Sequence, residues 1–96
     1  IGLTSSVGSA PQAYWGSYAA SKAAFDALLL TYADETENAG RVRIAIVDPG
    51  ATRTAMRSKA FPGEDPGSVK APEVVAARIV ALVGEDFVTG TRIRVN

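Results

Sequence analysis

The chain has 96 residues, of which 47% are hydrophobic and 21% are charged, a length that suits one small domain rather than two. Ten Lys and Arg residues balance ten Asp and Glu residues, so we expect neither nucleic acid nor an anionic membrane as a partner. The absence of cysteine and histidine excludes disulfides, thiolate catalysis and the usual zinc ligands, and leaves Asp, Glu, Lys or Tyr to act as an acid or base.

The first predicted elements are a short strand and a long helix. Residues 1–4, IGLT, are mostly apolar and run into a polar, glycine-containing loop over residues 5–16, which is typical of a buried strand that ends at a loop. Residues 17–38 are rich in Ala and Leu, contain neither Gly nor Pro, and stop before Gly40. This composition predicts a helix with a glycine at its C-terminal end.

The second half of the chain repeats the alternation of strand and helix. Residues 41–50, RVRIAIVDPG, predict a parallel strand that is covered on both faces and ends at Pro-Gly. A long loop follows over residues 51–71, with one helical turn near 55–60. Residues 72–83 begin with Pro and precede a Gly, which predicts a second helix, and residues 91–95, TRIRV, predict a closing strand.

The order of strand, helix, strand, helix, strand predicts an α/β fold with a parallel sheet and right-handed crossovers. Three strands would leave an apolar edge beside residues 1–4, so we expect further strands before residue 1. No apolar run approaches the roughly 20 residues that span a bilayer, and no charged leader precedes an apolar core. We therefore expect a cytoplasmic protein.

One pair of side chains near the start of the long helix has the spacing needed for acid–base chemistry. Tyr18 and Lys22 are four residues apart, so they share one face of the helix. A positive charge about 4 Å from the phenol oxygen contributes roughly 4 kcal/mol at an effective dielectric near 20, which stabilises the phenolate. Tyr14 is a competing phenol, but the residue four positions after it is Tyr18 and not a lysine.

Several segments together resemble the short-chain dehydrogenase/reductase family, in the family's order and spacing. They are TSSVG at a strand end, YAASK at the start of a helix, VDPGATRTAM after the next strand, and TGTRIRV at the last strand. The resemblance implies that residues 1–96 are the C-terminal portion of a single doubly wound, parallel-sheet Rossmann domain. Because the family's glycine-rich cofactor turn has no counterpart here, the resemblance implies that the N-terminal cofactor-binding half is absent from this chain. The 96 residues alone would then be inactive.

The resemblance implies three catalytic residues. Tyr18 would donate and accept the proton, and Lys22 would stabilise the phenolate and hydrogen-bond the nicotinamide ribose. Ser6 would bind the substrate oxygen, because it stands directly before Val-Gly and 12 residues ahead of Tyr18, and so fits the family's motif better than Ser5. We interpret Ser9 as a loop hydroxyl and Ser17 as a helix cap.

The resemblance also implies a cofactor-binding turn after the second strand. Pro49 and Gly50 would approach the nicotinamide, with Gly50 allowing close backbone contact. Thr54 would contact the carboxamide or the pyrophosphate, and Thr52 would act through its backbone. The loop over residues 61–70 resembles the family's variable substrate lid.

The implied function is hydride transfer between a nicotinamide cofactor and a small carbonyl compound or secondary alcohol. The cofactor would be NADP or NAD, with NADP favoured because WGSYAASK and AFPGEDP resemble a bacterial NADP-linked branch of oxidoreductases. The apolar helix resembles the family's subunit interface and implies a homodimer or homotetramer.

Three alternatives remain to be weighed. A non-catalytic nucleotide sensor or structural partner would not need Ser6, Tyr18 and Lys22 together. A hydrolase with a Ser-x-x-Lys pair is excluded because position 19 is alanine. No metal site is expected, because the acidic residues of the long helix are interpreted as a solvated face: Asp26, Asp34, Glu35 and Glu37.

Overall fold

Strands and helices alternate along the chain in the computed structural model, which describes residues 1–10 and 12–96. Pro11, in the predicted first loop, lies outside the described residues. The elements are β1 (Gly2–Leu3), the 3-10 turn η1 (Ser6–Gly8), α1 (Gly16–Thr36), the 3-10 turn η2 (Glu37–Ala39), β2 (Ala45–Asp48), α2 (Ala55–Ala60), the 3-10 turn η3 (Pro66–Ser68), α3 (Pro72–Val83) and β3 (Thr91–Arg94).

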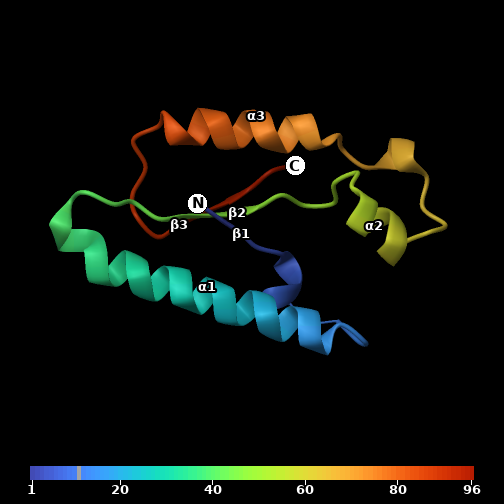
Figure 1. The fold of residues 1–96 in the computed structure, drawn as a ribbon, viewed down its shortest axis with the longest axis horizontal. Coiled ribbons are helices and arrows are strands. Elements are labelled where there is room, and N and C mark those ends of the chain that lie inside the picture. The colour runs from blue at the N-terminus through green and yellow to red at the C-terminus, as the bar shows by residue number, and fades with distance from the viewer. Residues whose placement is uncertain (11) are drawn as a thin grey trace.

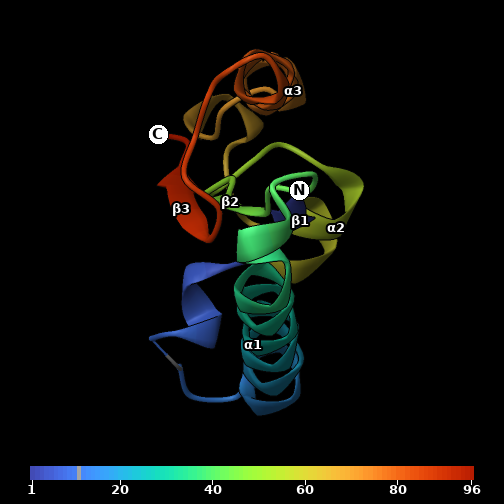
Figure 2. The same cartoon turned by 90° about the vertical axis from the view of Figure 1, so that its left-hand side faces the viewer.

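The strands form one parallel sheet in the order β1-β2-β3. Ile46 at the centre of β2 is in register with Gly2 of β1 on one side and with Arg92 of β3 on the other. Figures 1 and 2 show α1 on one face of the sheet and α3 on the opposite face. The predicted α/β arrangement with a parallel sheet is therefore confirmed.

The hydrophobic core lies between the sheet and α3. All four residues of β2 are buried, as expected for a central parallel strand. Ala45 and Val47 pack with Val75 and Leu82 of α3 and with Val95, which follows β3. Because side chains alternate across a strand, Ile46 points to the other face, toward α1.

The packing of α1 against the sheet depends on a glycine in β1. A side chain at Gly2 would overlap the Leu29 side chain, so the absence of a Cβ atom lets α1 lie close to β1. Ala19 and Ala33 are also buried. This close approach seats the middle of α1 against β1.

The ends of several elements differ in detail from the sequence prediction. α1 begins at Gly16, and the residue at its N-cap position is Trp15, whose side chain makes no capping hydrogen bond. Ser17 lies inside the first turn, so the predicted capping role of Ser17 is wrong. β2 is shorter than residues 41–50, because the backbone N–H of Ile44 donates to the Thr89 hydroxyl (2.9 Å).

Other predicted boundaries are confirmed. The helical turn after the second strand is α2, α3 begins at Pro72, and the chain after η2 turns at Gly40 with a left-handed φ of 68°. These boundaries coincide with the proline and glycine positions that determine local backbone geometry.

Candidate active site

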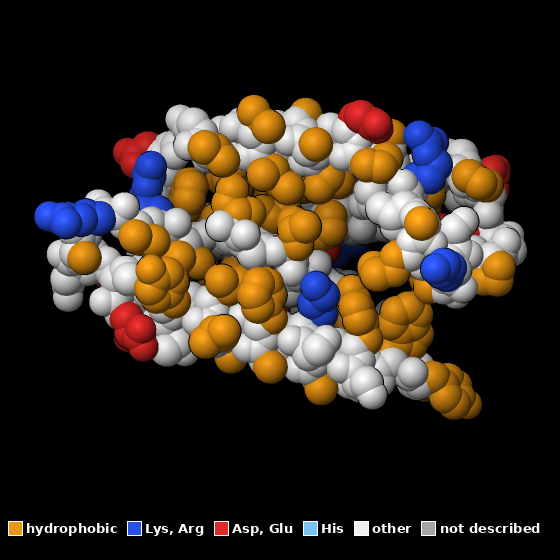
Figure 3. Space-filling view, in the orientation of Figure 1, with side chains coloured by type: hydrophobic (Ala, Val, Ile, Leu, Met, Phe, Trp, Pro, Cys, Tyr) orange, Lys and Arg blue, Asp and Glu red, His pale blue; other side chains and the backbone are white. Residues whose placement is uncertain are grey.

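A cavity of about 770 Å³ opens at the carboxyl ends of β1 and β2, the edge of a parallel sheet where α/β proteins bind ligands. It is bounded by the start of α1, by α2 and by the first half of α3. Figure 3 shows the hollow between these layers, with hydrophobic side chains around it. The structure brings together all seven predicted site residues in the cavity lining: Ser6, Tyr18, Lys22, Pro49, Gly50, Thr52 and Thr54.

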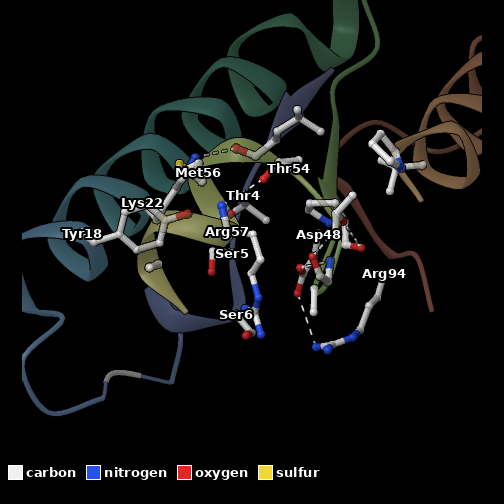
Figure 4. A pocket seen from close by; sticks show the side chains of 18 of the residues that line it. Thr4, Ser5, Ser6, Tyr18, Lys22, Asp48, Thr54, Met56, Arg57 and Arg94 are labelled. Atoms are coloured by element: carbon white, nitrogen blue, oxygen red, sulfur yellow. Dashed lines mark hydrogen bonds and ion pairs between the residues drawn. The ribbon is translucent and has the colours of Figure 1, made fainter. Parts of the chain in front are cut away.

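Tyr18 and Lys22 lie side by side on α1, as their spacing predicts. The Lys22 ammonium nitrogen is 5.8 Å from the centroid of the Tyr18 ring and donates a hydrogen bond to the Leu3 carbonyl (3.2 Å). Figure 4 shows the Tyr18 hydroxyl pointing into the cavity. Tyr14, the competing phenol, is fully exposed at 105% and is not among the residues that line the cavity.

Two adjacent serines reach the cavity from the start of η1, where Ser5 is the N-cap residue and Ser6 is the first residue. The Ser5 hydroxyl accepts a hydrogen bond from the Val7 N–H (3.3 Å) at the start of η1, whereas Ser6 is exposed. Both line the cavity together with Tyr18, and Figure 4 labels all three side chains around it. The interpretation of Ser9 as a loop hydroxyl is confirmed, since its side chain donates to the Ser6 carbonyl (3.2 Å).

A lysine that the sequence reasoning missed holds the turn after β2. Lys70 donates to the carbonyls of Pro49 (2.7 Å) and Ala51 (2.8 Å). The Asp48 carboxylate accepts from the Gly50 N–H (3.0 Å). Gly50 has a φ of 67°, which favours glycine. The Pro-Gly turn is therefore fixed from both sides, and no pattern in the sequence connected Lys70 with it.

Three threonines contribute hydroxyl groups near this turn. The Thr52 hydroxyl donates to the Gly50 carbonyl (3.1 Å), and the Thr54 hydroxyl caps α2 by accepting from the Arg57 N–H (3.1 Å). The Thr4 hydroxyl, on a residue 4% exposed, has no hydrogen-bond partner in the described part of the chain and lines the cavity. The only sequence signal for Thr4 was its position at a strand end.

An aromatic and charged cluster joins α1 to α2. Trp15 meets Tyr18 edge-on, with ring centroids 5.7 Å apart, and stacks on Phe61 at 5.8 Å. The Arg57 guanidinium lies 3.9 Å from the Phe61 ring centroid and donates two hydrogen bonds to the Glu64 carboxylate, at 3.0 and 2.7 Å. These hydrogen bonds hold the pKa of Glu64 below its usual range and raise that of Arg57.

The acidic residues of α1 divide into two groups. Asp34, Glu35 and Glu37 are exposed, as expected, but the prediction that Asp26 belongs to the same solvated face is wrong. Asp26 is 9% exposed and pairs with Arg92 of β3 at 3.1 Å, because it points toward the sheet. Over residues 1–10 and 12–96, no three His, Cys, Asp or Glu side chains gather as a metal site would require.

The cavity retains hydrogen-bonding capacity that fits a nicotinamide nucleotide. The buried Thr4 hydroxyl is without a partner in the described chain, and a lysine ammonium has three donors, of which Lys22 directs one to a carbonyl. The Thr54 hydroxyl accepts a bond and keeps its own proton to donate. Buried polar groups of this kind favour a polar ligand, and a carboxamide and a ribose offer both donors and acceptors.

Comparisons with known proteins agree on one family. A family model described as short chain dehydrogenase matches residues 1–65. The chain is 45% identical over 83 residues to the uncharacterized oxidoreductase YciK of Escherichia coli (strain K12), and the match covers 86% of this chain and 32% of YciK.

Solved structures give the same result. The structure of the oxidoreductase yciK from E. coli superposes with a TM-score of 0.88 and 41% identity, over 98% of this chain and 38% of that one. A protein from Shigella flexneri 2a str. 301, described as a short chain dehydrogenase complexed with NADP, has a TM-score of 0.87 and 41% identity, over 97% and 39%. The chain thus spans somewhat more than a third of these structures and 32% of the curated relative. None of the helices in the described residues is long and apolar enough to cross a membrane.

Proposed function

Because this chain belongs to the short chain dehydrogenase family, we propose that the whole protein transfers a hydride between NADP or NAD and a small carbonyl compound or secondary alcohol. Residues 1–96 would supply the C-terminal part of one Rossmann-type domain. The N-terminal cofactor-binding half would lie outside these residues.

One observation carries this proposal: a phenol, an ammonium group and two hydroxyls converge on one cavity from two different elements. Tyr18 and Lys22 come from α1, Ser6 is the first residue of η1, and Ser5 is the N-cap residue just before it. The contact of Gly8 with α1 supports their relative position, since a Cβ atom at Gly8 would lie 3.1 Å from the Ala23 backbone nitrogen. Acid–base chemistry requires groups that are held in such mutual reach.

In this proposal each residue of the candidate site has a separate role in proton transfer. Tyr18 exchanges a proton with the substrate oxygen, while the positive charge of Lys22 stabilises the phenolate. Ser6, which the motif favours, or its neighbour Ser5 orients the same oxygen by donating a hydrogen bond. Such positioned groups contribute through hydrogen bonds that strengthen as charge develops.

The cofactor assignment follows from the relatives and from the unsatisfied polar groups of the cavity. When bound, the nicotinamide supplies or accepts the hydride. Lys22 would hold its ribose, and the turn of Pro49 and Gly50 with Thr52 and Thr54 would hold its carboxamide or pyrophosphate. The NADP in the Shigella relative supports NADP over NAD.

Replacing Tyr18 by Phe tests the acid–base assignment. In the whole protein, Tyr18→Phe removes the exchangeable proton and keeps the ring, so we expect kcat to fall by at least about 100-fold and cofactor affinity to change little. NADPH oxidation with a panel of ketones and aldehydes measures the first effect, and cofactor fluorescence titration measures the second. Tyr32→Phe, on the exposed part of α1, is the control.

Two outcomes would contradict the proposal. Turnover retained in Tyr18→Phe would remove Tyr18 from the acid–base role. Cofactor binding without turnover of any carbonyl compound by the unchanged protein would favour the nucleotide sensor. The homodimer or homotetramer implied by the family resemblance stays a prediction.

A further inference from the structure

The wall of the cavity next to Tyr18 is built from apolar side chains. Trp15 lies edge-on to the Tyr18 ring at 5.7 Å and stacks on Phe61 with an angle of 22° between the rings. Met56 and Ala60 of α2 line the same cavity. If a substrate carbonyl oxygen meets the Tyr18 hydroxyl, the group attached to its carbonyl carbon lies within reach of this wall.

The positively charged side chains that line the cavity already have partners. The Arg57 guanidinium is held by both oxygens of Glu64, and Arg94 pairs with the buried Asp48 at 3.5 Å. Lys22 donates a hydrogen bond to the Leu3 carbonyl and lies beside the Tyr18 ring. A substrate carboxylate at Arg57 would therefore have to displace Glu64, whose own negative charge repels it.

We propose, on the premise of the function proposed above, that the site takes uncharged carbonyl compounds that carry an aromatic or similarly apolar group next to the carbonyl. Trp15 and Phe61 bind that group by ring contact, which favours offset or edge-on packing. Glu64 disfavours substrates that carry a carboxylate, because its own carboxylate already binds the Arg57 guanidinium. Arg57 of α2 is then a structural cation that holds the loop over residues 61–70 through Glu64, and not a receptor for substrate carboxylates.

Three carbonyl compounds test the proposal on the whole protein with NADPH. Methyl phenylglyoxylate is uncharged and aromatic. Phenylglyoxylate has a free carboxylate in place of its ester, and methyl pyruvate has a methyl group in place of its phenyl ring. We expect kcat/KM for methyl phenylglyoxylate to exceed that for each of the other two by at least about tenfold. Calorimetry measures the binding order of the same compounds separately from turnover.

Two variants separate the roles of ring and charge. Phe61→Ala removes ring contact, so the preference for methyl phenylglyoxylate over methyl pyruvate should shrink several-fold. Glu64→Gln removes the negative charge that neutralises Arg57, so the preference for the ester over its acid should shrink or reverse. Tyr32→Ala, an exposed aromatic, and Glu35→Gln, an exposed acid, are the matched controls. Ratios within one variant do not depend on the folded fraction.

The outcomes distinguish this inference from the proposed function. Turnover with equal efficiencies, with the acid preferred, or with preferences unchanged in both variants would overturn the inference and leave the function standing. Binding in the expected order without any turnover would support the inference and count against the function. If methyl phenylglyoxylate neither binds nor reacts, the apolar wall is not a substrate site.

Discussion

At the scale of single residues, the two serines at the start of η1, the N-cap residue Ser5 and the first residue Ser6, differ in their hydrogen bonds and exposure. The Ser5 hydroxyl is held by the Val7 N–H, whereas the Ser6 side chain is exposed and its carbonyl accepts from the N–H groups of Ser9 and Ala10. A hydroxyl that is already oriented loses less rotational freedom when it binds a substrate oxygen. The geometry therefore favours Ser5, although the family's motif favours Ser6.

Alanine variants of the two serines decide between them. We expect Ser5→Ala to lower kcat by about 100-fold or more, as expected for the loss of one hydrogen-bond donor to the reacting oxygen. Ser6→Ala should lower kcat by less than about tenfold. Steady-state kinetics of the whole protein measures both, with the exposed Ser58→Ala as control. A larger loss in Ser6→Ala would restore the motif-based assignment.

The charge state of Glu64 also belongs to this scale. Its pKa is lowered in the folded protein by the hydrogen bonds from Arg57, so the pair contributes stability above the ordinary pKa of a glutamate and loses it as the pH falls through the lowered value. Near neutral pH the pair is intact. The exclusion of acids from the cavity should therefore not vary with pH between about 6 and 8.

At the scale of elements, the candidate site depends on how closely η1 approaches α1. A Cβ atom at Gly8 would lie 3.1 Å from the Ala23 nitrogen and 3.2 Å from the Lys22 Cβ. These distances are shorter than ordinary contacts, and backbone atoms cannot give way as the end of a flexible side chain can. Gly8 thus fixes the separation between the serines and the Tyr18–Lys22 pair.

Gly8→Ala should therefore damage both stability and turnover. We expect a loss of about 1–3 kcal/mol in the free energy of unfolding from overpacking, together with a lower kcat/KM because η1 moves away from α1. Chemical denaturation and steady-state kinetics measure the two effects. Gly63→Ala, where an added Cβ meets no atom within 4 Å, should change stability by less than about 0.5 kcal/mol. Equal effects of both variants would refute the close-approach argument.

At the scale of the whole molecule, an ion pair joins α1 to the last strand across 66 residues of sequence. Asp26 is nine-tenths buried, and Arg92 of β3 reaches it at 3.1 Å. A buried carboxylate that loses its partner carries the full cost of its lost solvation. The pair helps to hold α1 against the sheet and so supports the position of Tyr18.

Arg92→Leu should destabilise the whole protein more than the same change at an exposed pair. We expect a loss of about 1–3 kcal/mol in the free energy of unfolding, because Asp26 remains buried and unpaired. Arg43→Leu breaks the exposed pair with Asp86 and should cost less than about 1 kcal/mol. Urea denaturation monitored by circular dichroism measures both. Similar losses would mean that the Asp26–Arg92 ion pair stabilises the protein no more than an exposed pair does.

The sequence by itself determined the elements and pointed to residues that line the cavity. The positions of Pro72, Gly40 and the Pro-Gly turn fix the backbone locally, so the start of α3, the turn after η2 and the end of β2 could be predicted from them. The spacing of Tyr18 and Lys22 places both on one helix face whatever the rest of the chain does. The motifs then located the serines and the turn that line the cavity.

Only the tertiary structure decided which distant groups meet. Helix spacing could not distinguish Asp26 from the exposed acids of α1, because its burial depends on Arg92 in a strand far along the chain. Lys70 on the Pro-Gly turn and Phe61 on Trp15 are likewise contacts between separate elements. Local preferences act over a few residues, whereas these contacts exist only after the elements have packed, and they determine the shape and charge of the cavity.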